Sequence, residues 1–273
     1  MKSVKALVLT GYGLNCDYET DFALRRAGAQ SRRVHLNDLI QGNENLDTYQ
    51  ILVFGGGFSW GDDHGAGVLF AAKMEFNLAT QLERFIHSGG LVLGICNGFQ
   101  ALVNLGLLPA LDRNYKERRV ALIANSSGNF IDTWVAMQVN PQSPCVFTKG
   151  TSWIELPVRH GEGLFYASPE DMAALLQQNQ VVLQYADGRG NLAKGSWPLN
   201  PNGSVNDVAG ICDPTGRIFG LMPHPEAFNH FTNHPDWTRK KELLARQGLE
   251  IADESGEGLQ IFRNAVDFIR QEN

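Results

Sequence analysis

Short apolar runs alternate along the first third of the chain with stretches in which apolar residues recur at helical spacing. The runs are rich in valine, leucine and isoleucine, which predicts strands buried on both faces. They span residues 4–10, 30–36, 50–54 and 91–95. Helical spacing over about 17–27 and 68–87 predicts helices, each followed by glycine. We therefore predict an α/β fold with an open, mostly parallel twisted sheet flanked by helices.

The pattern changes after Gly106, where strand-like runs follow one another without long helices. Runs over 120–124, 133–139 and 153–158 predict an antiparallel extension of the sheet. Later segments predict a short helix at 169–178 and strands at 181–186, 208–212 and 218–222. The last two strands are joined by Asp-Pro-Thr-Gly at 213–216, which carries turn residues typical of a hairpin.

Composition narrows the class of protein. The chain has 273 residues, of which 43% are hydrophobic and 19% charged, and a single domain over 1–273 accounts for this most simply. The net charge is 23 minus 29, or −6, without a basic stripe, which argues against nucleic acid or a membrane as partner. Four separated cysteines indicate a reducing compartment, so we expect a cytoplasmic protein. The apolar run at Val4 is too short for a signal peptide or membrane span.

Cys96 occupies the point where a predicted strand meets a predicted helix. It is the centre of Gly-Ile-Cys-Asn-Gly at 94–98, after which apolar positions continue at helical spacing until Gly106. Glycines on both sides of a nucleophile allow the sharp strand-to-helix turn of α/β enzymes, and a helix N-terminus favours a thiolate. From this stretch alone, a catalytic cysteine and an ordinary buried cysteine both remain open.

Three other glycine-rich segments follow predicted strands, where open α/β sheets place ligand sites. Residues 11–16 contain Gly-x-Gly, but Cys16 stands where a dinucleotide fingerprint needs glycine, so an ordinary turn explains them better. Residues 55–63 either hold an oxyanion with backbone amides or form a flexible turn. The His-Gly-Glu-Gly segment at 160–163 leaves open whether His160 belongs to a site or to the core.

His224 and Glu226 follow the last predicted strand within Pro-His-Pro-Glu. Side chains two residues apart in an extended segment point to the same side, so the carboxylate can orient the imidazole. The flanking prolines keep His224 extended. Together with Cys96 and a glycine loop, this predicts a Cys-His-Glu triad in which His224 is the base. The alternative is a loop histidine beside a solvated glutamate.

A metal site is the other chemistry that histidines in this region could serve. His230 and His234 lie four residues apart, but Pro235 opposes a helix there and no third ligand is near. We therefore predict no metal site.

These motifs resemble the triad (class I) glutamine amidotransferases. The resemblance rests on Gly-Ile-Cys-Asn-Gly-Phe-Gln at 94–100 and Pro-His-Pro-Glu at 223–226. It implies a flavodoxin-like fold and hydrolysis of the side-chain amide of L-glutamine, with ammonia passed to a synthetase. Within that group the chain is similar to glutaminase subunits of phosphoribosylformylglycinamidine synthase, in purine biosynthesis. The further matches are residues 56–62, 106–109, 160–163, 222–226 and 261–265.

The resemblance also implies residue roles. Cys96 corresponds to the nucleophile, His224 to the base and Glu226 to the acid that orients it. The backbone amides of Gly57 and Asn97 correspond to the oxyanion hole. The residues that correspond to a glutamine-binding surface are Gln100, His160, Gly161 and Glu162.

The family comparison further implies how the chain works with partners. No cofactor is expected in this chain, whereas ATP and Mg²⁺ are expected on a separate synthetase subunit, and a small accessory subunit is a further candidate partner. The stretch from about 228 to 256 is longer than in short family members and is expected to form a surface excursion. Two other functions stay open: a glutaminase that serves another synthetase, and a non-catalytic activating or scaffold subunit. The intact triad argues against the scaffold.

Overall fold

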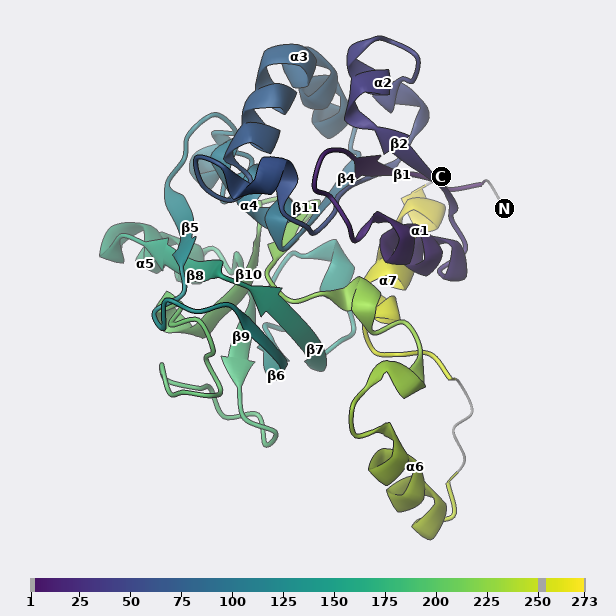
Figure 1. The fold of residues 1–273 in the computed structure, drawn as a ribbon, viewed down its shortest axis with the longest axis vertical. Coiled ribbons are helices and arrows are strands. Elements are labelled where there is room, and N and C mark those ends of the chain that lie inside the picture. Colours follow the sequence, from purple (N-terminus) through teal and green to yellow (C-terminus); the bar gives the residue numbers. More distant parts are fainter. Residues whose placement is uncertain (1–2, 250–253, 273) are drawn as a thin grey trace.

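The computed structural model describes residues 3–249 and 254–272, and a nine-stranded mixed sheet runs through it (Figure 1). The strand order is β2-β1-β3-β4-β11-β10-β9-β6-β7. In that order the strands span Gln30–His35, Lys5–Thr10, Ile51–Phe54, Leu91–Ile95, Ile218–Leu221, Val208–Cys212, Val181–Ala186, Ile131–Val139 and Trp153–His160. Most predicted strands lie within two residues of these bounds, because their apolar runs end at turn residues.

The first half of the sheet is parallel and is covered by helices. Strands β2, β1, β3, β4 and β11 pair in parallel, and every residue of β3 and β4 is buried. This burial explains their continuous apolar sequences. Two helix pairs, α3 with α4 and α1 with α7, lie on either side of these strands (Figure 1). The helices span α1 Asp17–Arg26, α2 Leu36–Ile40, α3 Val68–His87, α4 Asn97–Asn104, α5 Pro169–Gln177, α6 Trp237–Arg246 and α7 Leu259–Glu272.

The second half of the sheet is the predicted antiparallel extension. Strands β10, β9, β6 and β7 pair antiparallel in continuation of β11, and the predicted hairpin joins β10 to β11. One part of the prediction is wrong: β5 (Val120–Ala124) forms a separate two-stranded sheet with β8 (Glu162–Ala167). The sequence also predicts a glycine loop at 160–163. In fact Gly161 alone separates β7 from β8, and β8 alternates buried and more exposed residues as a half-buried strand does.

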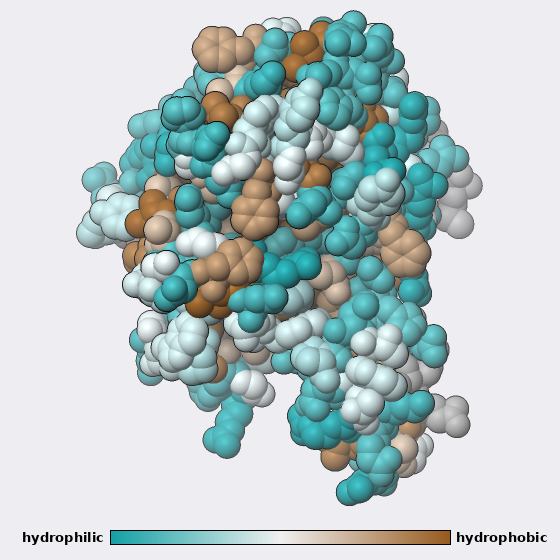
Figure 2. All heavy atoms as spheres, in the orientation of Figure 1, coloured by the Kyte–Doolittle hydropathy of each residue, from teal (hydrophilic) through white to brown (hydrophobic). Residues whose placement is uncertain are grey.

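Residues 228–249 form an excursion that we call the α6 lobe. The predicted excursion at 228–256 also includes residues 254–256, and its residues 250–253 lie outside the described residues. Figure 1 shows α6 projecting away from the sheet, and no residue of α6 is buried. In Figure 2 the lobe stands apart from the rest of the molecule with a mainly hydrophilic surface. None of the described helices is long and apolar enough to cross a membrane.

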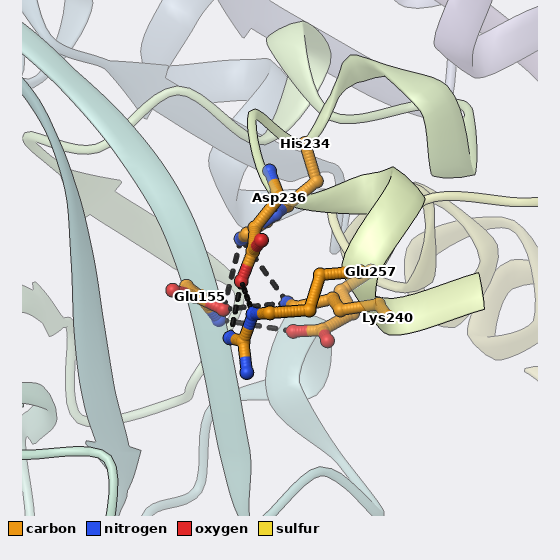
Figure 3. Close-up of polar contacts among 6 residues, drawn as sticks. Glu155, His234, Asp236, Lys240 and Glu257 are labelled. Atoms are coloured by element: carbon orange, nitrogen blue, oxygen red, sulfur yellow. Dashed lines mark hydrogen bonds and ion pairs between the residues drawn. The ribbon is translucent and has the colours of Figure 1, made fainter. Parts of the chain in front are cut away.

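One buried histidine attaches the α6 lobe to the sheet. The His234 ring lies 4.6 Å from the Trp134 ring of β6, and its Nδ1 accepts a 3.0 Å hydrogen bond from the Asp236 amide. The proton is therefore on Nε2, which lies 3.1 Å from a carboxylate oxygen of Glu155 on β7. Lys240 Nζ donates to the same Glu155 oxygen at 2.8 Å (Figure 3). The rings of Trp134, Phe228 and His234 contact one another, so the lobe is held by this ring cluster and by a small polar cluster.

Candidate active site

Cys96 lies in the sharp turn predicted between a strand and a helix. It is the residue between β4 and α4, with φ 51° and ψ −106°, a backbone conformation that costs a non-glycine residue about 1–3 kcal/mol. The amide of Cys96 donates to Leu221 O at 2.8 Å, which ties the turn to β11. A Cβ on Gly98 would lie 1.9 Å from Phe54 O, so only glycine lets α4 begin this close to β3. Two neighbouring strands therefore fix the strained turn.

His224 and Glu226 meet, although not in the way that the sequence predicted. His224 Nδ1 lies 2.6 Å from Glu226 Oε1, and both side chains are buried. His224 has an extended backbone, but Glu226 belongs to the 3₁₀ turn Pro225–Ala227 rather than to an extended segment. Proline at the first position of that turn has the φ that the turn requires. The His224 amide donates to Pro157 O at 2.8 Å, which fixes the histidine against β7.

The electrostatic surroundings of His224 favour its protonated form. Burial by itself lowers the pKa of the imidazole, but the Glu226 carboxylate and the Cys96 thiol raise it well above its ordinary value. His224 Nε2 is buried and has no hydrogen-bond partner among the described residues. Cys96 Sγ is instead directed at the carbonyl of Arg159, 3.8 Å away. The structure thus brings Cys96, His224 and Glu226 into one buried cluster whose thiol and imidazole interact.

Arg159 and Cys16 complete this cluster, and sequence reasoning missed both. An Arg159 guanidinium nitrogen lies 4.0 Å from Glu226 Oε1, so the buried carboxylate faces a cation as well as the imidazole. Cys16 Sγ lies 4.0 Å from His224 Nδ1, and burial raises the pKa of the Cys16 thiol. Their one signal in the sequence is position: Arg159 directly follows the strand predicted at 153–158, and Cys16 ends the glycine-rich segment at 11–16.

Among the described residues, three side chains that could hold a metal ion lie close together only in this cluster. Cys16, His224 and Glu226 place one candidate ligand atom each within 4.8 Å of one another, and within the described ranges no other group of three does so. The 2.6 Å hydrogen bond between His224 and Glu226 already accounts for two of these atoms. Neither His230 nor His234 belongs to the group.

In the glycine loop, Gly57 packs against the loop after β1. Gly57 has φ +144°, and a Cβ there would lie 2.4 Å from Gly13 O. Its neighbour Phe58 donates its amide to that same carbonyl at 2.8 Å, so the loop after β1 holds the glycine loop in place. No acceptor in the described part of the chain pairs with the Gly57 amide. The amide of Asn97, in the first turn of α4, is also free of an intrahelical acceptor.

Gln100 and Glu162 are in contact, as expected of residues that form one surface. Gln100 Nε2 donates to the backbone carbonyl of Glu162. Gln100 Oε1 accepts from Asn97 Nδ2 at 3.2 Å, and Asn97 Nδ2 also donates to Asp62 Oδ1 at 3.0 Å. The side chains of α4 therefore join the glycine loop to β8. Asp62 is a polar residue of this surface that sequence analysis did not single out.

The imidazole of His160 supports the turn between β7 and β8. His160 is 3% exposed, and its Nδ1 lies 3.1 Å from Asn125 Oδ1. Burial, together with the charge of His224, lowers the pKa of His160 to about 4. Asn125 Oδ1 also accepts a 3.0 Å hydrogen bond from the Gly163 amide, and the backbone amide of Asn125 donates to Gly161 O at 2.9 Å. Asn125, which sequence analysis did not identify, therefore organises the segment in which His160 and Gly161 lie.

Comparisons with known proteins agree with this geometry. The model of the CobB/CobQ-like glutamine amidotransferase domain matches residues 3–269, and the chain belongs to this family. The resemblance to glutamine amidotransferases found in the sequence is thereby confirmed. Among its relatives is a protein of Methanococcus maripaludis named phosphoribosylformylglycinamidine synthase subunit PurQ, 47% identical over 267 residues, covering 98% of each chain. A protein of Dehalococcoides mccartyi with the same name is 43% identical over 271 residues, 99% of this chain and 100% of that one.

A solved structure shows the same fold over the whole chain. A chain of the structure described as PurLQS from Thermotoga maritima matches with a TM-score of 0.68 and 29% identity. The match covers 98% of this chain and 100% of that one. The predicted α/β architecture is therefore confirmed both by the sheet itself and by this neighbour.

Proposed function

We propose that this chain is the glutaminase subunit of phosphoribosylformylglycinamidine synthase. In this role it hydrolyses L-glutamine to glutamate and ammonia and supplies the ammonia to a separate synthetase subunit in purine biosynthesis. The observation that carries the proposal is the Cys96 turn, strained and fixed by glycine, beside a His224–Glu226 pair with a 2.6 Å hydrogen bond. Relatives over 40% identical carry the PurQ name, which supports the choice of synthetase.

The chemistry follows from the properties of the three side chains. The Cys96 thiol transfers its proton to His224 Nε2, which has no other hydrogen-bond partner, and the thiolate attacks the carboxamide carbon of glutamine. Glu226 holds the imidazole in the required orientation and stabilises its positive charge. We assign stabilisation of the resulting oxyanion to the backbone amides of Gly57 and Asn97.

The reaction is then completed in two stages, loss of ammonia and hydrolysis of a thioester. His224 returns its proton to the departing nitrogen, so that the C–N bond breaks, ammonia leaves and a γ-glutamyl thioester remains on Cys96. Water, deprotonated by His224, attacks the thioester, and glutamate leaves with regeneration of the thiol. We assign glutamine binding to Gln100, Gly161 and Glu162, whereas His160 acts by supporting the turn that contains the last two.

The remaining parts of the proposal concern partners. We place ATP and Mg²⁺ on the synthetase subunit and no cofactor in this chain, and we propose that the chain works in the cytoplasm. One relative of known structure is described as PurLQS, and on that basis we propose a synthetase and a small accessory subunit as the partners. The buried, unpaired cysteines of this chain suit a reducing compartment.

Covalent labelling tests the proposal directly. A diazoketone analogue of glutamine should add one equivalent of mass to the protein, and peptide mapping should locate it on Cys96. Cys16→Ser is the matched control, because Cys16 is the other thiol close to His224, and this variant should still be labelled. Labelling that survives Cys96→Ser, or no labelling in the complete complex, would contradict the assignment.

A further inference from the structure

Arg159 is a partly buried cation at the end of β7 whose inner donors are not used. Its Nε and Nη2 atoms are buried, and neither has a hydrogen-bond partner among the described residues. Asp132 of β6 is exposed and lies opposite Arg159 in the register of the two strands. Opposite charges at such cross-strand positions attract each other, yet within the described ranges Arg159 forms its ion pair with Glu226. The guanidinium group therefore serves the Cys96 cluster rather than its neighbour on the sheet.

Glu226 supplies the acceptors for this guanidinium group. The carboxylate is fully buried, its Oε1 is bound to His224 Nδ1, and its Oε2 has no partner among residues 3–249 and 254–272. Arg159 Nη2 lies 4.0 Å from Oε1, which is too long for a hydrogen bond but short enough for an ion pair. Nε and Nη2 form an edge of arginine that matches a carboxylate. Unpaired donors and an unpaired acceptor thus belong to one buried contact.

The backbone of Arg159 is fixed beside the nucleophile. Its carbonyl oxygen lies 3.8 Å from Cys96 Sγ, so the strand end that carries the guanidinium group also contacts the thiol. In the proposed reaction the proton moves between Cys96 and His224, while Glu226 holds the imidazole. A fixed positive charge at this strand end therefore acts on the proton transfer as well as on the carboxylate.

We propose that Arg159 is a positioning residue of the glutaminase reaction: it holds the Glu226 carboxylate in place for His224, and its positive charge favours the thiolate of Cys96. This inference rests on the proposed function and adds a residue to the three that perform its chemistry. Arginine keeps its charge at every pH at which proteins are folded and active. Because a fixed cation opposes the addition of a proton to any group near it, removing that cation should move the proton transfer to higher pH.

The other groups that titrate close to the triad do not supply this charge. They are Cys16, His160 and Tyr185. Burial raises the pKa of the Cys16 thiol and of the Tyr185 phenol and lowers the pKa of His160 to about 4, so all three are neutral at pH 7. Helices α1 and α7 also pack against the 3₁₀ turn of Glu226. Of their charged residues, Asp17 is paired with Arg33 and Arg263 donates to Ser255 Oγ.

Substitutions of Arg159 separate its charge from its packing. In the complete complex with the synthetase subunit, kcat and KM for L-glutamine are measured as a function of pH. Arg159→Gln should move the kcat/KM profile to higher pH by about 0.5–1 unit and lower kcat about 10-fold, with KM unchanged. Arg159→Lys keeps the charge and should restore the position of the profile. Asp132→Asn is the matched control, because it removes the exposed charge opposite Arg159, and it should not move the profile.

A second variant and a second measurement guard against a folding defect. Arg159→Met keeps the apolar stem and should shift the profile as Arg159→Gln does. Alkylation of Cys96 by iodoacetamide, followed by peptide mapping across a pH series, should show the same shift without turnover.

The remaining outcomes each contradict a specific statement. A lower rate with an unmoved pH profile would overturn the inference, because lost packing alone explains such a result. A raised KM with normal kcat would overturn it as well, since Arg159 would then act on the substrate. A wild-type complex that releases no ammonia from glutamine would overturn the proposed function itself, and the alkylation series would still decide whether the charge of Arg159 acts on Cys96.

Discussion

The side chains around Cys96 and those of the α6 lobe are held in opposite ways. Cys96, His224 and Glu226 are each no more than 5% exposed, and the backbones of Cys96 and His224 are hydrogen-bonded to strands of the sheet. The α6 helix has no buried residue and is held by the contacts of His234 and Lys240 with Trp134 and Glu155. Burial fixes the positions of the Cys96, His224 and Glu226 side chains, whereas the α6 helix keeps its surface exposed and open to contact with another molecule.

The contrast between the buried Cys96 cluster and the exposed α6 lobe predicts different effects of substitutions in the two regions. Changes at the Cys96 cluster should remove the chemistry whether or not a synthetase subunit is present. Changes on the α6 lobe should leave the chemistry in place and alter only how it responds to that subunit.

Cys96→Ser should have the largest effect. We expect glutamine-dependent activity to fall by about 1,000-fold or more, because a hydroxyl is a far weaker nucleophile than a thiol here. Ammonia-dependent synthesis by the full complex should persist, since that step needs no thiol in this chain. Steady-state assays with glutamine and with ammonium salts measure both. Near-normal glutaminase turnover would show that Cys96 is not the nucleophile.

His224→Ala should cost more than Glu226→Gln. The histidine transfers the protons, whereas the carboxylate orients the ring and stabilises its charge, and members of such triads contribute unequally. The Gln variant keeps the shape of the side chain at the 2.6 Å contact. Single-turnover measurement of thioester formation ranks the two variants. Equal losses, or the reverse order, would contradict these roles.

The α6 lobe should matter for stimulation by the partner. We expect the isolated chain to hydrolyse glutamine slowly and the synthetase subunit to accelerate it. Trp237→Ala and Arg239→Ala should reduce that acceleration, because aromatic and arginine side chains are frequent anchors in interfaces. Arg246→Ala, at the far end of α6, is the matched control. Glutaminase rates with and without the synthetase subunit provide the test.

Two results would change this view of the lobe. A fully active isolated chain would remove the need for coupling. Normal stimulation of both variants would keep coupling but assign it to another surface.

The smallest predicted effect is a gain in stability on removing the charge of Asp62. Folding raises the pKa of Asp62 from 3.8 to about 6, so the native state loses stability as the pH rises through that interval. Asn cannot ionise, so Asp62→Asn should raise the free energy of unfolding at pH 7 by about 1 kcal/mol, a value reduced for partial exposure. Denaturant titrations should find no such gain below about pH 4. An equal gain at both pH values would mean that ionisation is not the cause.

Much of the fold could be predicted because buried strands carry their signal locally. The bounds of β4 follow from a short apolar run, and those of α3 from apolar residues at helical spacing that stop shortly before Gly89. The grouping of Cys96, His224 and Glu226 could be predicted because each lies in a short motif with restricted backbone: glycines around Cys96 and prolines around His224. The extended conformation predicted at Glu226 is wrong, because Pro225 begins a 3₁₀ turn that includes Glu226.

The remaining site residues could not be predicted because their contacts join distant segments. Cys16 reaches His224 across 208 positions, and Asn125 reaches His160 across 35. Such contacts depend on strand order, which local pattern does not encode. The pairing of β5 with β8 also joins distant segments and could not be predicted. In addition, glycines at the start of β8 hide its alternation of buried and more exposed residues.

Strand β7 touches both regions. It receives Lys240 of the α6 lobe at Glu155, accepts the amide of His224 at Pro157, and ends at His160 in the wall of the site. These five steps of extended backbone span about 17 Å. Glu155 and Pro157 lie two residues apart on this strand, so the α6 lobe and His224 are hydrogen-bonded to one short segment of the sheet.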